Sequence, residues 1–444
     1  MKPGPIAVFS HTPPSVTRGG AEISAYALYL GLRQLGLDAV FVSACPVADL
    51  GKVLPGSADE HVIPYESGDY DTFYHLAAPE LVNAVERLVT RLGCRTLVFH
   101  HFLFLGTNTI RRMVELGHEV VLTLHEFLSL CHHHGQMVTR PGFRLCRESH
   151  PALCVQCFPG LQPDQFAARK VSILGNLDGV TAFVSPSHFL AERCRGWGFP
   201  GDRLHVIENG LIGEAHDAGR SPADPAASMR FAVEEGARHH GGGPARIGEE
   251  PFPPHRVARG ADDALVIGFF GQLNPFKGLD VILDAAARLA ADAEPQRCRF
   301  RVHGHVVGLN EALRTRFDEA VASGVLDYRG PYDNADVLEL MRACDFILMA
   351  SRWWENSPLV IQEAFLARRP LIVPGIGGMA EKVRDRVSGL HFRPSDGADL
   401  ARACRLAATL GHDAFSFPVP SSSEEMARRY LAAIGAGAEV AADA

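Results

Sequence analysis

Two glutamates in the C-terminal part of the chain have a spacing that could support chemistry. Glu355 and Glu363 are separated by seven residues in the segment 351–365 (SRWWENSPLVIQEAF). Ser357-Pro358 predicts a helix start, with Ser357 as the N-cap and proline at the first helical position. Such a helix N-terminus offers free N–H groups and a positive dipole end, which suit a phosphate. Glu363 would lie two turns further on, where its carboxylate could accept hydrogen bonds from ribose hydroxyls.

The flanking residues bear on the ordinary alternative, in which both glutamates lie on a solvated helix face. Trp353-Trp354 precedes the predicted helix, and Leu359-Val360-Ile361 begins it. Large apolar side chains on both sides of the pair argue against a solvated face. We therefore expect a partly enclosed site at this point of the chain.

Other segments could approach a phosphate. Lys277-Gly278 follows a predicted strand and opens a predicted helix, so the Lys277 ammonium could meet a diphosphate as a point charge. Gly19-Gly20 precedes the first predicted helix, and residues 375–380 (GIGGMA) weakly match the dinucleotide fingerprint G-x-G-x-x-A. Glycine lets a backbone approach a ligand closely. The alternatives are an exposed loop lysine and simple tight turns.

Histidines follow two predicted strands of the N-terminal half. His100-His101 ends one strand, and His125-Glu126 ends the next. The carboxyl ends of parallel strands form the ligand-binding edge of an open sheet. Imidazole suits acid–base or hydrogen-bonding roles near neutral pH. A buried structural histidine is an equally weighted alternative at each position.

Four of the ten cysteines are clustered as C-x14-C-x7-C-x2-C, at Cys131, Cys146, Cys154 and Cys157. In a reducing compartment, this spacing favours a tetrahedral structural zinc site slightly over four free thiols or a disulfide. The segment has little apolar periodicity, so a metal could replace a missing core. Four thiolates leave no open coordination position, so such a zinc would not be catalytic. The six scattered cysteines are interpreted as packing residues.

Composition excludes several classes of protein. The 444 residues are 47% hydrophobic and 21% charged, which is typical of a globular chain of two or three domains. With 43 Lys and Arg against 51 Asp and Glu, the net charge of −8 argues against nucleic-acid binding. No apolar run approaches the roughly 18–20 residues of a membrane span, and the apolar stretch at 6–10 is too short for a signal peptide. We expect a cytoplasmic protein, either free or at the inner face of the membrane.

The elements that position these residues follow a repeated strand–helix order. Short buried strands are expected at 6–10, 39–44, 96–100, 120–124 and 180–185, and again from 265 and at 299–303, 346–350 and 371–374. Helical patterns are expected at 22–36, 279–291, 310–322, 334–343 and 357–367. The fold class is therefore α/β, with two doubly wound domains that would face each other across a cleft.

Composition also predicts the domain boundaries. Residues 1–212 are expected to form an N-terminal domain that includes the cysteine-bearing segment 131–157. Residues 213–262 are rich in Gly, Pro, Ala, Arg and His and are expected to be an insert or linker. Residues 263–410 are expected to form a second domain. The tail 411–444 is expected to contain a helix that packs back on the N-terminal domain.

Taken together, these motifs resemble glycosyltransferase family 4, whose members have the two-domain GT-B fold of Rossmann-like units. The retaining members carry a Glu-x7-Glu motif, matched here by Glu355 and Glu363. The resemblance extends to residues 269–289 (FFGQLNPFKGLDVILDAAARL), 375–383 (GIGGMAEKV) and 18–22 (RGGAE). It covers nearly the whole chain except 213–262. It implies that residues 1–212 form the acceptor-side domain and that residues 263–410 form the nucleotide-sugar-binding domain. Some members carry a similar cysteine-bearing segment.

The resemblance implies roles for individual residues. An Arg and a Lys usually clamp the donor diphosphate, and Lys277 matches the lysine, but the arginine position is Gln272. The charge of the departing diphosphate would then be balanced fully only if another residue, such as Arg352, replaces the missing arginine. Gly19 and Gly20 would face the donor phosphates. The backbone of Gly377, Gly378 and Met379 would contact the donor sugar. The resemblance also implies a functional histidine, which is either His125, the residue we prefer, or one of His100 and His101.

We therefore expect a retaining glycosyltransferase that uses a nucleotide-sugar donor and a glycan, lipid-linked or small-molecule acceptor, with no cofactor for the chemistry. Glu355 would act at the donor sugar, Glu363 would hold the ribose, and Lys277 and the helix start at Ser357 would bind the diphosphate. No acidic metal motif is present at a strand end, and contact with a membrane surface is left open. The alternatives are a sugar-nucleotide epimerase and a non-catalytic sugar-nucleotide-binding subunit.

Overall fold

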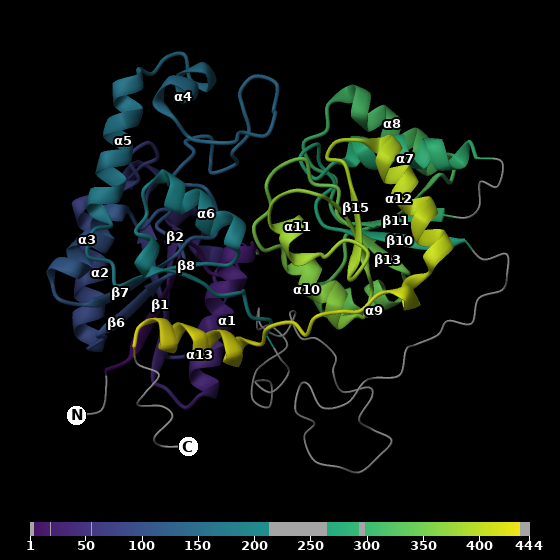
Figure 1. Cartoon of the computed structure of the whole chain (residues 1–444). Helices are drawn as coiled ribbons and strands as arrows, with labels where there is room; N and C mark the ends of the chain where they lie inside the picture. Colours follow the sequence, from purple (N-terminus) through teal and green to yellow (C-terminus); the bar gives the residue numbers. More distant parts are fainter. Residues whose placement is uncertain (1–3, 18, 55, 213–263, 293–297, 436–444) are drawn as a thin grey trace, which may run out of the picture. The chain divides into compact units, whose positions relative to one another are not determined.

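The computed structural model describes residues 4–17, 19–54, 56–212, 264–292 and 298–435. They form two compact units, which are treated separately here (Figure 1). The first unit contains the described residues up to 212 together with those from Ser421 onward, and the second contains those from 264 to Pro420. The linker expected at 213–262 lies entirely outside the described residues. The second unit runs to Pro420 and not to residue 410 as expected.

The first unit is built on a seven-stranded, wholly parallel sheet in the order β3-β2-β1-β6-β7-β8-β9. The strands are β1 (Ile6–Ser10), β2 (Ala39–Pro46), β3 (Glu60–Tyr65), β6 (Thr96–Phe99), β7 (Glu119–Thr123), β8 (Ala182–Ser185) and β9 (Leu204–Val206). The pair β4 (Tyr70–Asp71) and β5 (Leu76–Ala77) is antiparallel. The helices are α1 (Gly20–Gln34), α2 (Pro79–Leu92), α3 (Thr107–Glu115), α4 (Pro151–Cys157), α5 (Pro163–Asn176) and α6 (His188–Trp197).

The end of the described chain returns to this first unit. Helix α13 (Ser423–Ala433) packs along α1, where the side chain of Met426 is fully buried. Leu211 donates its N–H to the carbonyl of Ser421 at 2.8 Å, which joins the two chain segments. The hydroxyls of Tyr430 and Thr123 are 2.9 Å apart, so α13 also contacts the end of β7.

The second unit is built on a six-stranded parallel sheet in the order β12-β11-β10-β13-β14-β15. The strands are β10 (Leu265–Phe270), β11 (Cys298–His303), β12 (Leu326–Gly330), β13 (Phe346–Leu348), β14 (Leu371–Pro374) and β15 (Gly389–Phe392). The helices are α7 (Leu279–Ala290), α8 (Glu311–Ala322), α9 (Val337–Arg342), α10 (Leu359–Leu366), α11 (Gly377–Lys382) and α12 (Gly397–Leu410).

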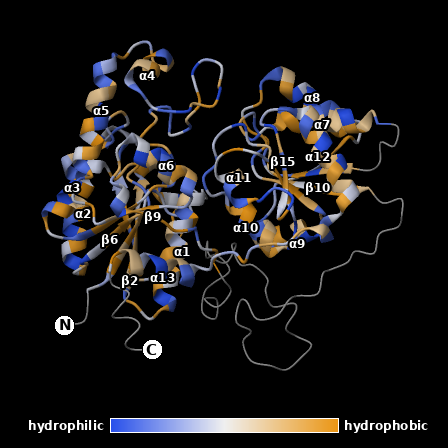
Figure 2. Ribbon diagram, viewed as in Figure 1, coloured by the Kyte–Doolittle hydropathy of each residue, from blue (hydrophilic) through white to orange (hydrophobic). Residues whose placement is uncertain are grey.

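Burial of both sheets explains why their central strands are almost continuously apolar. In the first unit, Phe9 of β1 stacks on Phe99 of β6 with ring centroids 4.3 Å apart. In the second, the side chains of Ile267, Phe346 and Ile372 are fully buried from three adjacent strands. Figure 2 shows hydrophobic strands inside each unit and hydrophilic residues on the outer faces of the helices. None of the described helices is long and apolar enough to cross a membrane.

Candidate active site

The sheet order of the second unit creates the candidate site. The chain runs outward from β10 to β12 on one side and then resumes beside β10 with β13. The loops after β10 and β13 therefore diverge from adjacent strand ends, the geometry in which open parallel sheets bind ligands. The first loop carries Gln272 and Lys277, and the second carries Glu355. Residues that are far apart in the sequence are thereby brought into contact.

Glu355 is the centre of this contact. Its Oε1 accepts hydrogen bonds from Lys277 Nζ at 2.6 Å, Ser351 Oγ at 2.8 Å and Trp353 Nε1 at 2.8 Å. Its Oε2 accepts no hydrogen bond from any described residue. One carboxylate oxygen is therefore fixed by three donors, and the second remains able to meet a ligand.

The electrostatics of the pair keep Glu355 ionised. Burial raises the pKa of this carboxyl, but the attraction and hydrogen bond of Lys277, with the bonds from Trp353 and Ser351, outweigh it and lower the pKa below its ordinary value of 4.5. The side chains of Glu355 and Lys277 are 15% and 29% exposed. A carboxylate in this state can stabilise positive charge or accept hydrogen bonds, but it cannot donate a proton near neutral pH.

Lys277 is held from several directions. Its Nζ lies 5.6 Å from the centroid of the Trp353 ring, which stacks on Phe276 with centroids 5.2 Å apart. Its backbone N–H donates to Asn274 Oδ1 at 2.9 Å. The next residue, Gly278, has φ of 80°, and a Cβ there would lie 2.0 Å from the carbonyl oxygen of Ala350. Only glycine lets the two loops approach this closely.

The two residues considered for the missing positive charge are differently placed. Gln272 is exposed, and its Oε1 accepts from Asn274 Nδ2 at 3.4 Å. Arg352 forms an ion pair with Asp280, with Nη1 and Oδ2 2.7 Å apart, and its Nε donates to Ser395 Oγ at 3.3 Å. The charge of Arg352 is therefore already balanced by Asp280. Lys277 is also paired, with Glu355.

The helix start was predicted one residue too early. Helix α10 begins at Leu359, with Pro358 in the N-cap position and no capping hydrogen bond from a side chain. The prediction that Ser357 is the N-cap was wrong, because Pro358 has an extended ψ of 126° and the helical turn begins after it. Ser357 lies just outside the helix.

Glu363 lies on α10 in a different environment from Glu355. Its side chain is buried, and burial raises its pKa to about 7, while a hydrogen bond with Asn334 acts in the opposite direction. Its charge also raises the pKa of the nearby Tyr332, for which burial is the larger cause. Glu363 is therefore poised between its neutral and ionised forms near neutral pH.

The second glycine turn supports the Glu355 loop. Gly378 donates its N–H to the carbonyl of Glu355 at 2.7 Å, and a Cβ at this position would lie 1.9 Å from the carbonyl oxygen of Asn356. Met379 is fully buried. Gly377 begins α11 with φ of 58°. In this structure, the Gly378 N–H is thus occupied within the protein, and Gly378 positions the loop that carries Glu355.

The first unit has its own reversal of strand order, between β1 and β6. Gly19 is the N-cap of α1, and a Cβ there would lie 2.5 Å from Oε2 of Glu22, whereas Gly20 adjoins open space. Glu22 is buried beside His11, with Oε1 and Nε2 3.2 Å apart. Burial raises the pKa of Glu22, but hydrogen bonds and charge from His11 outweigh it and lower the pKa. Glu22 and His11 were not singled out by the sequence.

The three predicted histidines gather at this edge because β6 and β7 are adjacent. His100 Nδ1 and His125 Nε2 are 2.9 Å apart, and His101 Nε2 lies 3.8 Å from Glu126 Oε1. Burial lowers the pKa of His100 to about 3 and lowers that of His101 and His125. The imidazoles are therefore neutral at pH 7, which suits hydrogen bonding better than proton transfer.

No disulfide joins the four clustered cysteines in this structure. Cys146 Sγ donates to the carbonyl of Glu148 at 3.1 Å, and Cys157 Sγ accepts from the N–H of Arg140 at 3.3 Å. In the described part of the chain, no three His, Cys, Asp or Glu side chains are arranged to hold a metal ion. The zinc site at Cys131, Cys146, Cys154 and Cys157 stays a prediction.

Comparison with known families identifies both units. Residues 18–212 match the model of Glycosyltransferase Family 4, and residues 264–409 match that of Glycosyl transferases group 1. The chain belongs to the family 4 glycosyltransferases. A curated relative, the D-inositol 3-phosphate glycosyltransferase of Geodermatophilus obscurus, is 32% identical over 228 residues, which are 46% of this chain and 48% of the relative. The match thus spans about half of that relative's length.

Solved structures show the same GT-B fold of two Rossmann-like units. Sucrose-phosphate synthase from Thermosynechococcus elongatus is similar with a TM-score of 0.61 and 16% identity, over 99% of this chain and 97% of that chain. Anabaena HepE, solved in complex with UDP, is similar with a TM-score of 0.58 and 15% identity, over 99% of both chains. Similarity at this level of identity establishes the fold alone.

Within this family 4 glycosyltransferase, the site contains residues that the sequence patterns did not indicate. Ser351 and Trp353 complete the hydrogen bonds of Glu355, and Asn334 bonds Glu363. The Trp353-Trp354 pair was noted only as an apolar flank. The indole N–H of Trp353 could have suggested a polar partner, because a buried tryptophan usually donates a hydrogen bond. Ser351 and Asn334 gave no comparable signal.

Proposed function

We propose that this protein is a retaining glycosyltransferase that moves a glycosyl group from a nucleotide-sugar donor to a hydroxyl-bearing acceptor. The observation that carries the proposal is the ionised Glu355, whose Oε1 is fixed by Lys277, Ser351 and Trp353 while Oε2 accepts no hydrogen bond from a described residue. An anion placed beside a cation suits a reaction in which positive charge develops on the sugar and negative charge on the leaving diphosphate. Family membership and fold support the same reaction class.

In the proposed mechanism, the side chains divide the charges of the reaction. Glu355 holds a donor-sugar hydroxyl through Oε2 and stabilises the oxocarbenium-like centre. Lys277, already fixed beside Glu355, adds its charge to the departing diphosphate. Glu363 binds the ribose hydroxyls, to which its ionised form can offer two acceptor oxygens.

The donor class is proposed from the same site. A uridine diphosphate sugar is the first candidate, because the similar Anabaena HepE was solved with UDP and with UDP-glucose. The proposed acceptors are a glycan, a lipid-linked sugar or a small polyol. We further propose that the neutral His125 or His101 hydrogen-bonds the donor sugar, in a reaction that takes place in the cytoplasm.

Calorimetry tests the role of Lys277. The intact protein and Lys277→Ala are titrated with UDP-glucose, UDP and uridine, with Arg314→Ala as the control because Arg314 is an exposed cation on α8 of the same unit. We expect Lys277→Ala to weaken UDP binding about tenfold or more, as for loss of a charge-assisted hydrogen bond, and to leave uridine binding within about twofold. Equal losses for UDP and uridine would show that Lys277 does not sense the diphosphate.

Product analysis tests the reaction. Incubation with a donor and a panel of acceptors should release nucleoside diphosphate and give a product with the anomeric configuration of the donor. Isomerised donor without nucleotide release would indicate an epimerase. Binding without any turnover of donor across the panel would indicate a sugar-nucleotide-binding subunit.

A further inference from the structure

A surface of the first unit that the proposed function does not use presents arginines around an exposed aromatic ring. Thr139 N–H donates to the carbonyl of Arg144 at 2.8 Å, and Phe143 N–H donates back to the carbonyl of Thr139 at 3.0 Å. These bonds and an antiparallel bridge between Val138 and Leu145 close a tight hairpin. All five residues of its tip, 140–144 (RPGFR), are exposed, and Phe143 is 51% exposed.

The charge of this tip contrasts with that of the chain. Arg140, Arg144 and Arg147 are exposed, and Glu148 is the single acidic residue between 140 and 150. None of these three arginines forms an ion pair with a described residue. The whole chain, by contrast, has a net charge of −8. The hairpin is thus a local cationic patch on an acidic protein.

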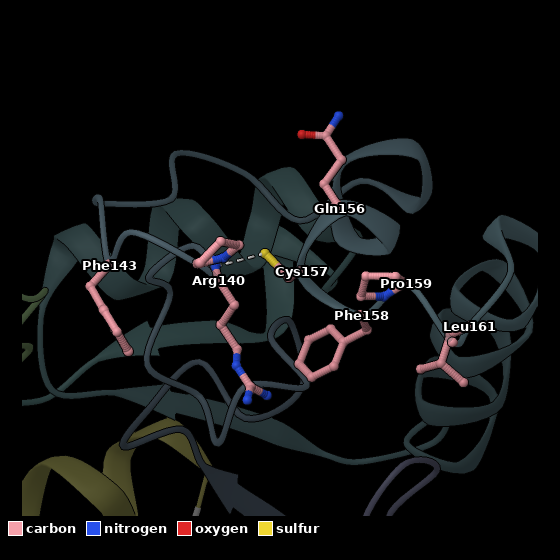
Figure 3. Close-up of a pocket in the computed structure, with 9 residues that line it drawn as sticks. Arg140, Phe143, Gln156, Cys157, Phe158, Pro159 and Leu161 are labelled. Atoms are coloured by element: carbon pink, nitrogen blue, oxygen red, sulfur yellow. Dashed lines mark hydrogen bonds between the residues drawn. The ribbon is translucent and has the colours of Figure 1, made fainter.

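An apolar hollow lies beside the patch. A depression of about 650 Å³ is formed between the hairpin and the end of α4, with Phe158, Pro159 and Leu161 on one side and Arg140 and Phe143 on the other (Figure 3). The Arg140 guanidinium lies 5.3 Å from the centroid of the Phe158 ring. Leu153 of α4 adds a second exposed apolar side chain at 43% exposure. Apolar and cationic groups therefore alternate over a small surface.

We infer that the hairpin 138–145 and α4 dock on an anionic lipid bilayer, with Phe143 inserted among the lipids and Arg140, Arg144 and Arg147 bound to headgroup phosphates. Guanidinium groups bind phosphates bidentately, and aromatic side chains beside basic ones are typical of segments that lie in a membrane interface. An exposed tip with one aromatic ring needs no matching surface on a bilayer, whereas a stable protein partner needs about 800 Å² of complementary surface. Three arginines on an acidic chain are too few for nucleic-acid binding.

Vesicle co-sedimentation of the full chain tests this inference. We expect binding to vesicles of 30% phosphatidylglycerol in phosphatidylcholine, at least tenfold weaker binding to pure phosphatidylcholine, and loss of binding as salt rises. The triple variant Arg140→Gln/Arg144→Gln/Arg147→Gln should weaken binding about 100-fold, and Phe143→Ser about tenfold. The matched controls are Arg87→Gln/Arg91→Gln/Arg95→Gln, which removes three exposed arginines in and just after α2, and Val171→Ser, which removes an exposed apolar side chain from α5.

A second variant keeps the test independent of folding defects. Phe143→Trp should retain binding, and its emission should shift to the blue on anionic vesicles and be quenched by brominated lipid. Absence of binding to anionic vesicles, equal loss in the control triple variant, or an unshifted tryptophan would each overturn the inference. Donor binding is measured on the same proteins. If vesicle binding fails while UDP still binds, this inference fails and the proposed function stands. If vesicles bind while UDP does not, the proposed function fails and this inference stands.

Discussion

Replacing Lys277 by methionine removes the counter-charge of Glu355 and retains a side chain of similar length. Loss of one partner from a fully buried ion pair destabilises a protein by about 3–5 kcal/mol, whereas an exposed pair contributes about 0.2–1 kcal/mol. The Lys277–Glu355 pair lies between these limits, because its side chains are 29% and 15% exposed. We therefore expect Lys277→Met to lower the free energy of unfolding at pH 7 by about 2 kcal/mol.

The pH dependence of this loss is the sharper expectation. In the parent, the pKa of Glu355 lies below 4.5, so the stability that the ionised carboxylate contributes is present above about pH 4.5 and is lost as pH falls through its folded pKa. In Lys277→Met, the lysine charge that opposes the effect of burial is absent, so burial should raise the pKa of Glu355 above 4.5. Folded Glu355 then takes up a proton before the unfolded chain does, so the deficit of the variant should shrink as pH falls from 7 toward 4.5.

Urea unfolding from pH 4.5 to 8, followed by circular dichroism and tryptophan fluorescence, measures this deficit. Arg316→Met is the control, because Arg316 pairs with Asp284 on the exposed faces of α8 and α7 of the same unit. The control should lose less than about 1 kcal/mol. The double variant Lys277→Met/Glu355→Gln should recover about 1 kcal/mol relative to Lys277→Met, because no buried charge is left unpaired. A deficit that is the same at pH 4.5 and pH 7, or no larger than in the control, would refute the reasoning.

Three further outcomes are expected. Glu355→Gln should lower the rate of transfer about 100-fold with the fold intact, since in the proposed mechanism it removes a charge at the reacting sugar. Activity within about twofold of the parent in a donor-turnover assay would contradict this role. Because burial raises the pKa of Glu363 to about 7, ionising this carboxyl should lower the free energy of unfolding of the parent by about 2–3 kcal/mol as pH rises from about 4.5 to 7. Glu363→Gln should not show this decrease in urea unfolding, and parallel pH profiles of parent and variant would exclude the raised pKa. Metal analysis should find about one zinc per chain in protein purified without added zinc and none in Cys154→Ser/Cys157→Ser, and metal-free parent protein as stable as the variant would exclude the site.

The central strands could be predicted from the sequence because a strand buried on both faces is a nearly continuous apolar run. The strands at 6–10 and 371–374 were predicted with the bounds that the structure gives them. The outer strands β3 (EHVIPY) and β12 (LDYRG) were missed, because an edge strand has one partner and tolerates polar residues and proline. The helix expected at 334–343 is shorter, with α-helical turns only from Val337 to Arg342.

The contacts of the candidate site depend on sheet order, which the local sequence does not contain. Lys277 and Glu355 meet because β10 and β13 are neighbours, although the intervening chain forms two other strands. Tyr430 reaches the histidines by a longer route, since its ring stacks on His100 with centroids 5.9 Å apart. Patterns of hydrophobicity indicated which residues end strands, but not which strand ends are adjacent.

The Glu-x7-Glu spacing selects two carboxylates, but their surroundings give them different chemistry. Glu355 meets a lysine ammonium, a hydroxyl and an indole N–H, and together these lower its pKa despite partial burial. Glu363 is buried with one hydrogen bond from Asn334, and its pKa rises to about 7. Pairs of titratable groups whose environments shift their pKa values in opposite directions are characteristic of sites that assign them separate roles. In the proposed mechanism, Glu355, which is ionised at neutral pH, suits the centre where positive charge develops, whereas Glu363 is suited to ionise fully when ribose hydroxyls replace part of the solvation that its burial removes.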